Sequence, residues 1–535
     1  MRLSALWTPS ENFRALWVAD ADFDDSQVPS YMPTGYRNDN GSCAVPQVAG
    51  FNGGTGCPVY AAVTPNSAPV AVAYGGTDPT IAFGANSYGD RNDSHMYGGS
   101  LRLDWTLAGA TLTSVTGARK MDRTWGSGSG SPYIDQDILG IENLKTFSQE
   151  VRLASNGASA LRWLVGAYYS RDSVADLTDY NFAQNYEIAS LSPAPIVFFN
   201  NVSQITQSEA VFAHVEYALS RKWKLIVGAR ETHDGINYTY SSGANAIFAP
   251  EDELTPVPYD HATLSSNGPT GKLGLDFQPS DNLLLYLSAS EGYKCGGFPG
   301  AIAFLPYPAT EPASAYLPSY GSEKLFAYEA GAKATLADDA LVLDSSIFYY
   351  DWRNMQATTE IPYGTAPNVI EVFSLGNAGD VRIYGLDEDL NWRMTREWSL
   401  RAALNLMDSR IVTGIYKGEV PVQAPKESGN LALRYQSAHR VVGELPFVQV
   451  DYSYRTSVYF TLPNVAADSQ PGYGLLGLRA GAMTYDGKWQ WSLWVRNLAN
   501  KAYLVDAFGA ASTFLADRHL EAVPRTFGLN VRYTY

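Results

Sequence analysis

Apolar and polar residues alternate one by one along many segments of this chain. In the last segment, single polar or small residues separate the apolar residues Phe527, Leu529, Val531, Tyr533 and Tyr535. Alternation with period 2 places apolar side chains on one face of a β-strand and polar side chains on the other. The same pattern recurs at residues 399–406, 430–435, 448–455 and 489–496. We therefore expect the chain to fold mainly into long strands.

Nineteen segments are predicted to be strands. They cover residues 1–8, 13–23, 95–107, 111–122, 143–155, 161–171, 207–219, 222–236, 267–278, 283–293, 322–336, 341–355, 379–393, 397–411, 426–438, 446–460, 471–485, 488–500 and 523–535. Many have ten or more residues, the length that a tilted strand needs to cross about 25 to 30 Å of hydrocarbon. Strands of a soluble β-sandwich usually have about five or six residues. A β-propeller would show a repeat of about 40 to 50 residues, which we do not find.

The connections between these strands alternate between short and long. Short turns are expected at residues 9–12, 155–158, 220–222, 279–282, 337–339, 395–397 and 486–488. Long stretches rich in Gly, Pro, Ser and Tyr are expected to be loops at about residues 24–94, 173–206, 237–266, 294–321 and 356–378. Short turns on one side and long loops on the other are typical of an all-β, antiparallel transmembrane β-barrel of the outer-membrane type.

The number of predicted strands is odd, whereas an antiparallel sheet that closes on itself needs an even number. The first and last strands run in the same direction, so closure requires an odd number of further strands. We expect residues 1–535 to form one barrel domain that is incomplete at its N-terminal side. Residues 1–7 contain one basic residue and no apolar core, which does not resemble a signal peptide.

Composition excludes several classes of protein. Charged residues make up only 17% of the chain, and Gly (47), Tyr (35) and Trp (12) are plentiful, which argues against disorder and against a coiled coil. The longest apolar runs, such as residues 194–199, are far shorter than the ~18 to 20 residues of a membrane-spanning helix. A net charge of −16 would repel the phosphate backbone of a nucleic acid.

The sequence carries no pattern typical of an enzyme. Its six histidines occur singly, without the spacing of a zinc site, and there is no Gly-x-Ser-x-Gly motif. Residues 472–477 match the dinucleotide-binding pattern of glycines, but they open a predicted strand instead of joining a strand to a helix. We expect no catalytic residue, no metal site and no cofactor. Cys43 and Cys57 are either a disulfide or two free thiols.

Several short motifs resemble the barrel region of TonB-dependent outer-membrane receptors. They are residues 290–298 (SEGYKCGGF), 328–333 (YEAGAK), 348–352 (FYYDW), 377–380 (NAGD), 384–387 (YGLD), 495–503 (VRNLANKAY) and 524–528 (PRTFG). Their order and spacing extend over nearly the whole chain. The resemblance implies a barrel of about 22 strands around a plug domain. Relative to that pattern, we expect the signal peptide, the TonB box, the plug and three strands to be missing from residues 1–535.

The resemblance also implies a function. Receptors of this family lie in the bacterial outer membrane and import scarce, large solutes such as metal chelates, corrinoids or glycans. They catalyse no reaction, and the TonB complex of the inner membrane supplies the energy. The expected partners are therefore outer-membrane lipid, the TonB complex, a plug domain and an extracellular small-molecule ligand.

Alternation predicts which charged side chains point into the barrel. They are Glu150, Arg152, Arg230, Glu329, Lys333, Asp387, Asp389, Arg401, Arg434, Asp451, Arg455, Arg496 and Arg532. In a plugged barrel such side chains would bind the plug, and in an open barrel they would line a water-filled pore. Salt bridges along the wall are an equally simple role for many of them.

Aromatic residues in the predicted loops are candidates for ligand contact, because rigid rings supply much of the contact area in binding surfaces. They are Tyr133, Tyr180, Phe182, Tyr186, Tyr238, Tyr240, Tyr293, Phe298 and Tyr316. Most are expected to pack the loops instead.

Two other functions remain open at this stage. A barrel without a plug would act as a passive channel, although an unpaired strand edge in lipid leaves costly backbone groups without partners. A soluble, secreted β-rich binding protein, adhesin or hydrolase is the remaining alternative, and it would need no detergent for extraction.

Overall fold

The computed structural model describes residues 1–26, 32–35, 91–128, 137–157, 159–181, 196–246, 260–299, 319–363, 370–441, 443–509 and 517–534. Almost all regular structure in these residues is β-strand, and one short 3₁₀ helix, η3, covers Ala466–Asp468. Within the described ranges, no helix has the length and apolar character needed to span a bilayer.

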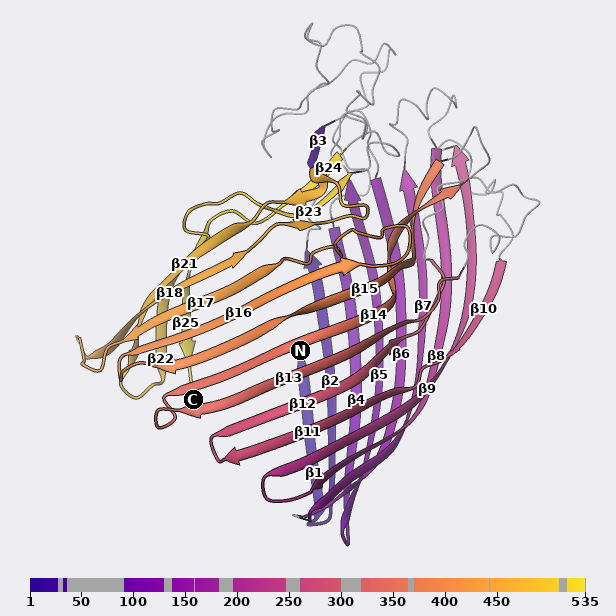
Figure 1. Ribbon diagram of the computed structural model, residues 1–535. Helices are drawn as coiled ribbons and strands as arrows, with labels where there is room; N and C mark the ends of the chain where they lie inside the picture. Colours follow the sequence, from indigo (N-terminus) through magenta and orange to yellow (C-terminus); the bar gives the residue numbers. More distant parts are fainter. Residues whose placement is uncertain are drawn as a thin grey trace, which may run out of the picture.

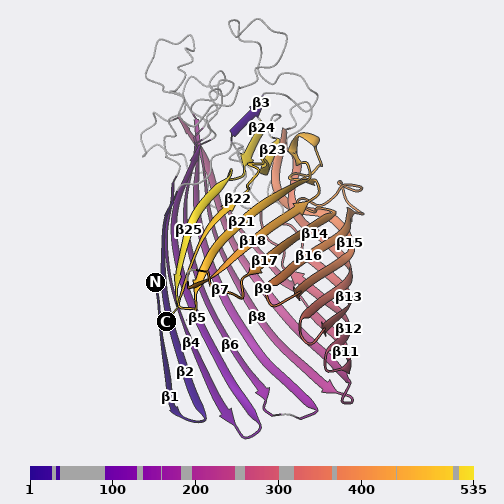
Figure 2. The ribbon, with the colours of Figure 1, turned by 90° about the vertical axis from the view of Figure 1, so that its left-hand side faces the viewer.

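A single antiparallel sheet of twenty strands makes up most of the molecule (Figure 1). Its strands are β1 (Arg2–Ser10), β2 (Phe13–Ser26), β4 (Arg91–Leu107), β5 (Ala110–Gly128), β6 (Asp137–Ser155), β7 (Leu161–Asn181), β8 (Ile196–Ala218), β9 (Trp223–Ala246), β10 (Asp260–Asn267), β11 (Thr270–Ser280), β12 (Leu283–Lys294), β13 (Glu323–Leu336), β14 (Leu341–Tyr363), β15 (Ile370–Arg393), β16 (Trp398–Ile411), β17 (Glu427–Gln436), β18 (Glu444–Arg455), β21 (Tyr473–Thr484), β22 (Trp489–Arg496) and β25 (Thr526–Tyr533). Tight turns join neighbouring strands at one end of the sheet (Figure 2).

The nineteen predicted strands are confirmed. The twenty strands of the main sheet make nineteen crossings of it, called passes below, because β10 and β11 together make one crossing. β10 and β11 both pair with β9: Asp260–Asn267 lies along its outer part, and residues 270–277 lie along the part nearer the tight turn. They are two halves of one pass that is interrupted at Gly268, where the backbone N–H still bonds to Thr232. Each remaining strand pairs with the next one along the sheet.

Several strands extend further from the tight turns than the sequence predicts. The expected loops at 173–206, 237–266 and 356–378 are wrong at their ends, because β7 continues to Asn181, β8 begins at Ile196, β9 reaches Ala246 and β14 reaches Tyr363. In these extensions apolar and polar residues no longer alternate regularly, while the backbone ladder continues. Periodicity detects a strand only where its two faces meet different environments.

β1 and β25 are the edges of the main sheet. In the described part of the chain, β1 pairs only with β2, and β25 pairs only with β22. The nineteen passes alternate in direction, so these two edge strands run the same way.

One face of the sheet is apolar and exposed. Large side chains with 38% to 63% exposure on this face include Trp17, Leu101, Val211, Ile347 and Leu493. Such a surface suits hydrocarbon rather than water. The opposite face, called the inner wall below, carries ion pairs and hydrogen-bonded polar side chains.

Smaller elements lie at the end away from the tight turns (Figures 1 and 2). β3 (Met32–Gly35), β24 (Asp517–Glu521) and β23 (Leu504–Gly509) form a three-stranded sheet, here called the outer sheet. β19 (Val458–Tyr459) and β20 (Ser469–Gln470) form a short ladder beside it. The outer sheet joins a segment that follows β2 to one that precedes β25.

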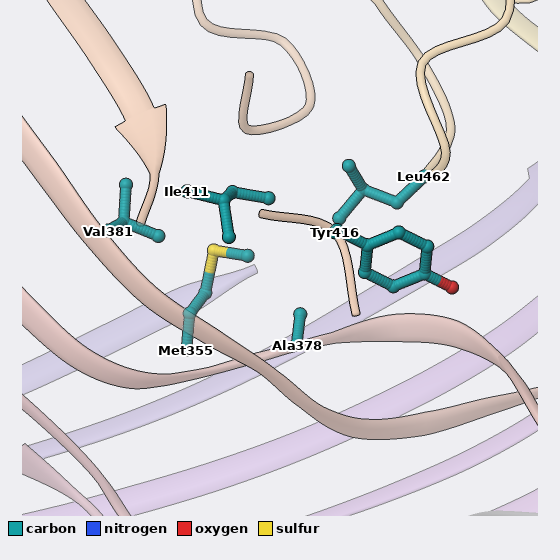
Figure 3. Close-up of a cluster of buried hydrophobic side chains, with 6 residues drawn as sticks. All are labelled: Met355, Ala378, Val381, Ile411, Tyr416 and Leu462. Carbon is teal, nitrogen blue, oxygen red and sulfur yellow. The ribbon is translucent and has the colours of Figure 1, made fainter. Parts of the chain in front are cut away.

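A buried apolar cluster fixes the connections that follow β16 and β18. Met355, Ala378, Val381, Ile411, Tyr416 and Leu462 converge in Figure 3. The first four belong to β14, β15 and β16, while Tyr416 and Leu462 come from the connections. Burial of these side chains from water holds residues 412–420 and 456–470 against the strand ends.

Two glycines allow a close crossing beside this cluster. Gly379 and Gly414 have φ values of +129° and +83°, a region that side chains with a Cβ rarely adopt. A Cβ on Gly379 would overlap the carbonyl oxygen of Thr413, and one on Gly414 would overlap that of Ala378. The two backbones are packed too closely for any other residue.

Replacing Gly379 should therefore destabilise the fold. Gly379→Ala is expected to lower the free energy of unfolding by about 2 kcal/mol through overpacking and backbone strain. Urea unfolding followed by tryptophan fluorescence would measure it. Gly235→Ala is the matched control, because a Cβ on Gly235 meets nothing within 4 Å. Equal stability of the two variants would contradict the close crossing.

Candidate functional site

Sequence motifs that are distant along the chain meet at the ends of β12 and β13 away from the tight turns, beside β14 and β15. Glu323 Oε2 accepts hydrogen bonds from the Gln356 backbone N–H at 2.6 Å and from Trp352 Nε1 at 3.3 Å. Its other carboxylate oxygen forms an ion pair with Lys294 Nζ at 3.4 Å. One buried carboxylate thus connects β12, β13 and β14, and this group of contacts is called the rim network.

Asn377 is the second centre of the rim network. Its Oδ1 accepts a hydrogen bond from the Gly321 N–H at 2.6 Å, and its Nδ2 donates to the carbonyls of Gly321 and Asn354 at 3.0 and 2.9 Å. Asn354 has a φ of +58° at a bulge in β14, and its Nδ2 donates to the Ser322 carbonyl at 2.8 Å. The bulge aims these amides at the connection between β12 and β13.

Both ends of that connection are thereby anchored to each other. Gln356 Nε2 donates to the carbonyls of Cys295 and Gly321 at 2.8 and 3.1 Å, and Gly297 pairs with Tyr320 in an isolated bridge. Burial raises the pKa of the Cys295 thiol, and the negative charge of Asp234 adds to this effect. Burial also raises the pKa of the Tyr320 hydroxyl. Both groups are therefore neutral at pH 7.

Three of the nine candidate aromatic residues form one stack. Tyr238 lies 5.0 Å from Phe298 and 6.4 Å from Tyr240, measured between ring centroids, with nearly parallel planes. Tyr238 donates to the Pro299 carbonyl at 3.1 Å, and Tyr240 donates to Asn200 Oδ1 at 3.0 Å. Tyr238 and Tyr240 are 5% and 2% exposed. In this structure the stack holds the segment after β12 against β8 and β9.

Tyr293 also takes part in packing. Its hydroxyl lies 2.7 Å from Ser266 Oγ, and its ring occupies the space beside Gly268 at the interruption between β10 and β11. The other candidates lie outside the described residues. They are Tyr133, Phe182, Tyr186, Tyr316, Cys43, Cys57 and the side chain of Tyr180.

Five of the predicted inward charges line one concavity of about 670 Å³ on the inner wall. They are Glu329, Lys333, Asp387, Asp389 and Arg455. Lys333 forms an ion pair with Asp344, and Glu329 accepts a hydrogen bond from Tyr286. Asp387 accepts one from Asn405 Nδ2 at 2.5 Å. Lys333, Glu329 and Asp387 are thus held by neighbours on adjacent strands.

Arg455 is the least satisfied member of this group. Its guanidinium lies 5.0 Å from the centroid of the Tyr473 ring. Its Nε is buried and has no hydrogen-bond partner in the described part of the chain. An unpaired buried donor is costly, so the guanidinium of Arg455, which lines the concavity, is a candidate contact for an acceptor oxygen on a ligand.

The other eight predicted charges are distributed along the rest of the inner wall. Glu150 and Arg152 form an ion pair at 3.1 Å. Arg230 lies over the Tyr168 and Phe212 rings, Arg434 over Phe447, and Arg496 over Trp494. Asp451 accepts a hydrogen bond from Gln449 at 2.7 Å. Arg401 lies opposite Ala432, and Arg532 lies opposite Gln490.

Sequence reasoning missed part of the concavity. Tyr286, Asp344, Asn405 and Tyr473 also line it. Each alternates with outward apolar residues, as Asp344 does with Leu343, so period 2 carried the signal. Tyr286, Asn405 and Tyr473 carry no charge and so fall outside the predicted set of inward charges. Asp344 is charged but was absent from that set. Within the described ranges, no three His, Cys, Asp or Glu residues lie close enough to hold a metal ion.

Comparison with known proteins identifies this architecture. The family model described as TonB dependent receptor-like, beta-barrel matches residues 18–498. The chain belongs to this family. TonB-dependent receptors are outer-membrane transport proteins, and the family resemblance carried by the short motifs is thus confirmed.

Solved structures of TonB-dependent receptors have the same fold. The ferric yersiniabactin uptake receptor FyuA from Yersinia pestis superposes with a TM-score of 0.74 at 15% identity, over 99% of this chain and 70% of that one. The siderophore receptor PiuA from Acinetobacter baumannii gives 0.68 at 17% identity, over 100% and 74%. The ferric-catecholate import receptor Fiu from Escherichia coli gives 0.68 at 16%, over 99% and 74%. At these identities the likeness concerns the fold alone.

The rim network makes a testable prediction. Asn377→Ala removes the partners of the Gly321 N–H and of two carbonyls, each worth about 1 kcal/mol. Hydrogen exchange at Gly321, measured by mass spectrometry, should accelerate about tenfold. Asn391→Ala, which removes a single exposed hydrogen bond to Asp389 on the same strand, should leave exchange there unchanged. Unchanged exchange in both variants would show that Asn377 does not anchor the connection.

Proposed function

We propose that this chain forms the barrel of an outer-membrane receptor that imports a scarce, large solute with energy supplied through TonB, and that the solute is a ferric chelate. Family membership supports the transport role. FyuA, Fiu and the ferric citrate transporter FecA, named for ferric chelates, support the class of solute.

Arg455 is the observation that carries the choice of solute. Arg455 lines a concavity of about 670 Å³ that also holds Lys333 and several carboxylates, and its buried Nε has no hydrogen-bond partner in the described part of the chain. Iron chelators present anionic oxygen atoms, and a guanidinium binds such oxygens through charge-assisted hydrogen bonds. The carboxylates in the same lining can accept hydrogen bonds from donor groups of the solute.

Three of the nine candidate aromatic residues argue against a glycan as the solute. A sugar ring needs an aromatic face that is free to stack, but the rings of Tyr238, Tyr240 and Phe298 stack on one another and bury their hydroxyl groups or edges. In the described part of the chain, the candidate rings therefore stabilise the barrel mouth.

In the proposed receptor a plug domain occupies the barrel. Arg401 and Arg434 support this arrangement, since they form no ion pair within the described ranges. In the described part of the chain, Arg434 donates hydrogen bonds to Gln436 and Gln449 and lies over the Phe447 ring. Carboxylates of a plug would neutralise these two cations inside the barrel.

Uptake experiments test the proposal. Cells that express the intact receptor in the outer membrane should accumulate radioactive iron from a panel of ferric chelates, and deletion of the TonB protein should abolish accumulation. Uptake that persists without TonB would favour a passive channel. Uptake of labelled oligosaccharide or corrinoid, but of no ferric chelate, would overturn the choice of solute and leave the transport role intact.

Substitution of Arg455 sharpens the test. Arg455→Gln should raise the chelate concentration needed for half-maximal uptake about tenfold, because one charge-assisted hydrogen bond is lost. Lys222→Gln, at an exposed tight turn, is the control with the same loss of charge. If both variants import the chelate as well as the parent, Arg455 does not contact it.

A further inference from the structure

Positive charges face each other across neighbouring strands at three places in the main sheet. Lys120 on β5 is directly opposite Lys145 on β6, Lys324 on β13 is opposite Arg353 on β14, and Arg382 on β15 is opposite Arg410 on β16. Like charges directly opposite each other destabilise a sheet. A chain with a net charge of −16 nevertheless has three such pairs.

All three pairs belong to the outward, apolar face. Lys145 is in step with exposed Phe147 and Val151, and Arg410 is in step with exposed Leu404 and Leu406. Arg353 is in step with exposed Ile347 and Tyr349 on β14. The cations therefore continue the rows of side chains that meet hydrocarbon.

The three pairs also lie at one level. Each cation is ten to twelve residues from the end of its strand at the tight turn, as Lys120 is from Ala110 and Arg410 is from Trp398. About ten residues of a tilted strand span an apolar band about 25 Å tall. The pairs thus mark the outer border of that band, where lipid headgroups begin.

Two groups of these cations have little compensation from the protein. The first consists of Lys120, Lys145 and Arg171. Arg171 on β7 belongs to it because it lies opposite Phe147, which is two residues from Lys145 on the same face of β6. Asp122 pairs with Lys120 at 2.5 Å, whereas Lys145 and Arg171 have no ion-pair partner in the described part of the chain. The second group is Arg382 and Arg410, which likewise have none, since the nearby Asp408 binds Lys426 and Tyr384.

The remaining pair differs from these two groups. Lys324 is neutralised by Glu291 at 2.9 Å, and Arg353 by Asp351 at 2.9 Å. The Arg353 guanidinium also lies over the Phe326 ring. This pair is satisfied by the protein itself, so it needs no ligand.

We propose that Lys145 with Arg171, and Arg382 with Arg410, bind the phosphate groups of phosphorylated lipids in the outer leaflet. Arginine matches a phosphate bidentately and lysine binds it as a point charge. Two cations on adjacent strands can share one phosphate, and its negative charge then offsets their mutual repulsion. The proposal rests on the barrel lying in a membrane and is independent of the imported solute.

Native mass spectrometry of the purified chain in detergent tests this proposal. The probes are bisphosphorylated lipid A and the same lipid after removal of both phosphates. The parent should retain the phosphorylated lipid at least tenfold better than the dephosphorylated one, and rising salt should weaken the binding. Equal retention of both lipids would overturn the proposal, as would equally tight binding of inorganic phosphate alone.

Paired substitutions locate the two sites. Lys145→Gln with Arg171→Gln, and Arg382→Gln with Arg410→Gln, should each reduce retention of lipid A about tenfold. Arg221→Gln with Lys222→Gln is the matched control, because it removes two positive charges from a tight turn at the opposite end of the sheet. A heat-dependent shift in gel migration checks that each variant is folded. The same loss of lipid in the control would mean that overall charge, and not these sites, holds the lipid.

Discussion

The backbone hydrogen-bond ladder is the constraint on which the rest of this structure depends. In hydrocarbon every N–H and C=O must find a partner within the protein, and a strand can satisfy its own only through its neighbours. Within the described ranges, seventeen of the nineteen passes pair on both sides, whereas the edge strands β1 and β25 each pair on one side only. The register of those pairs then decides which side chains face hydrocarbon and which face the interior, so both the inner wall and the outward cations follow from it.

The sequence predicted the parts of the fold in which the two faces of a strand meet different surroundings. Every one of the nineteen passes was found in this way. The extensions of β7, β8, β9 and β14 were not found, because apolar and polar residues do not alternate regularly along them. β10 (Asp260–Asn267) was also missed, because nearly all of it lies in the loop expected at residues 237–266.

The candidate site was harder to predict for a different reason. Glu323 and Asn377 act on residues that are distant in sequence, such as Lys294 and Gly321, and no local pattern records such contacts. The motifs that carried the family resemblance contain several of these residues, so the motifs reflect the geometry of the barrel rim. Tyr238 and Phe298 were chosen as ligand contacts for their large rings, and the same property makes them effective packing residues.

The outer sheet has a consequence for how the molecule assembles. β3 follows the second strand of the chain, whereas its partner β24 comes just before the last strand. Contacts between residues so distant in sequence form slowly, because the entropy cost of closing a long loop must be met before the contacts contribute any stability. The outer sheet can form only after both of its halves have been made, and residues 36–516 lie between them. We therefore expect it to form late in folding, after the local pairings of neighbouring strands.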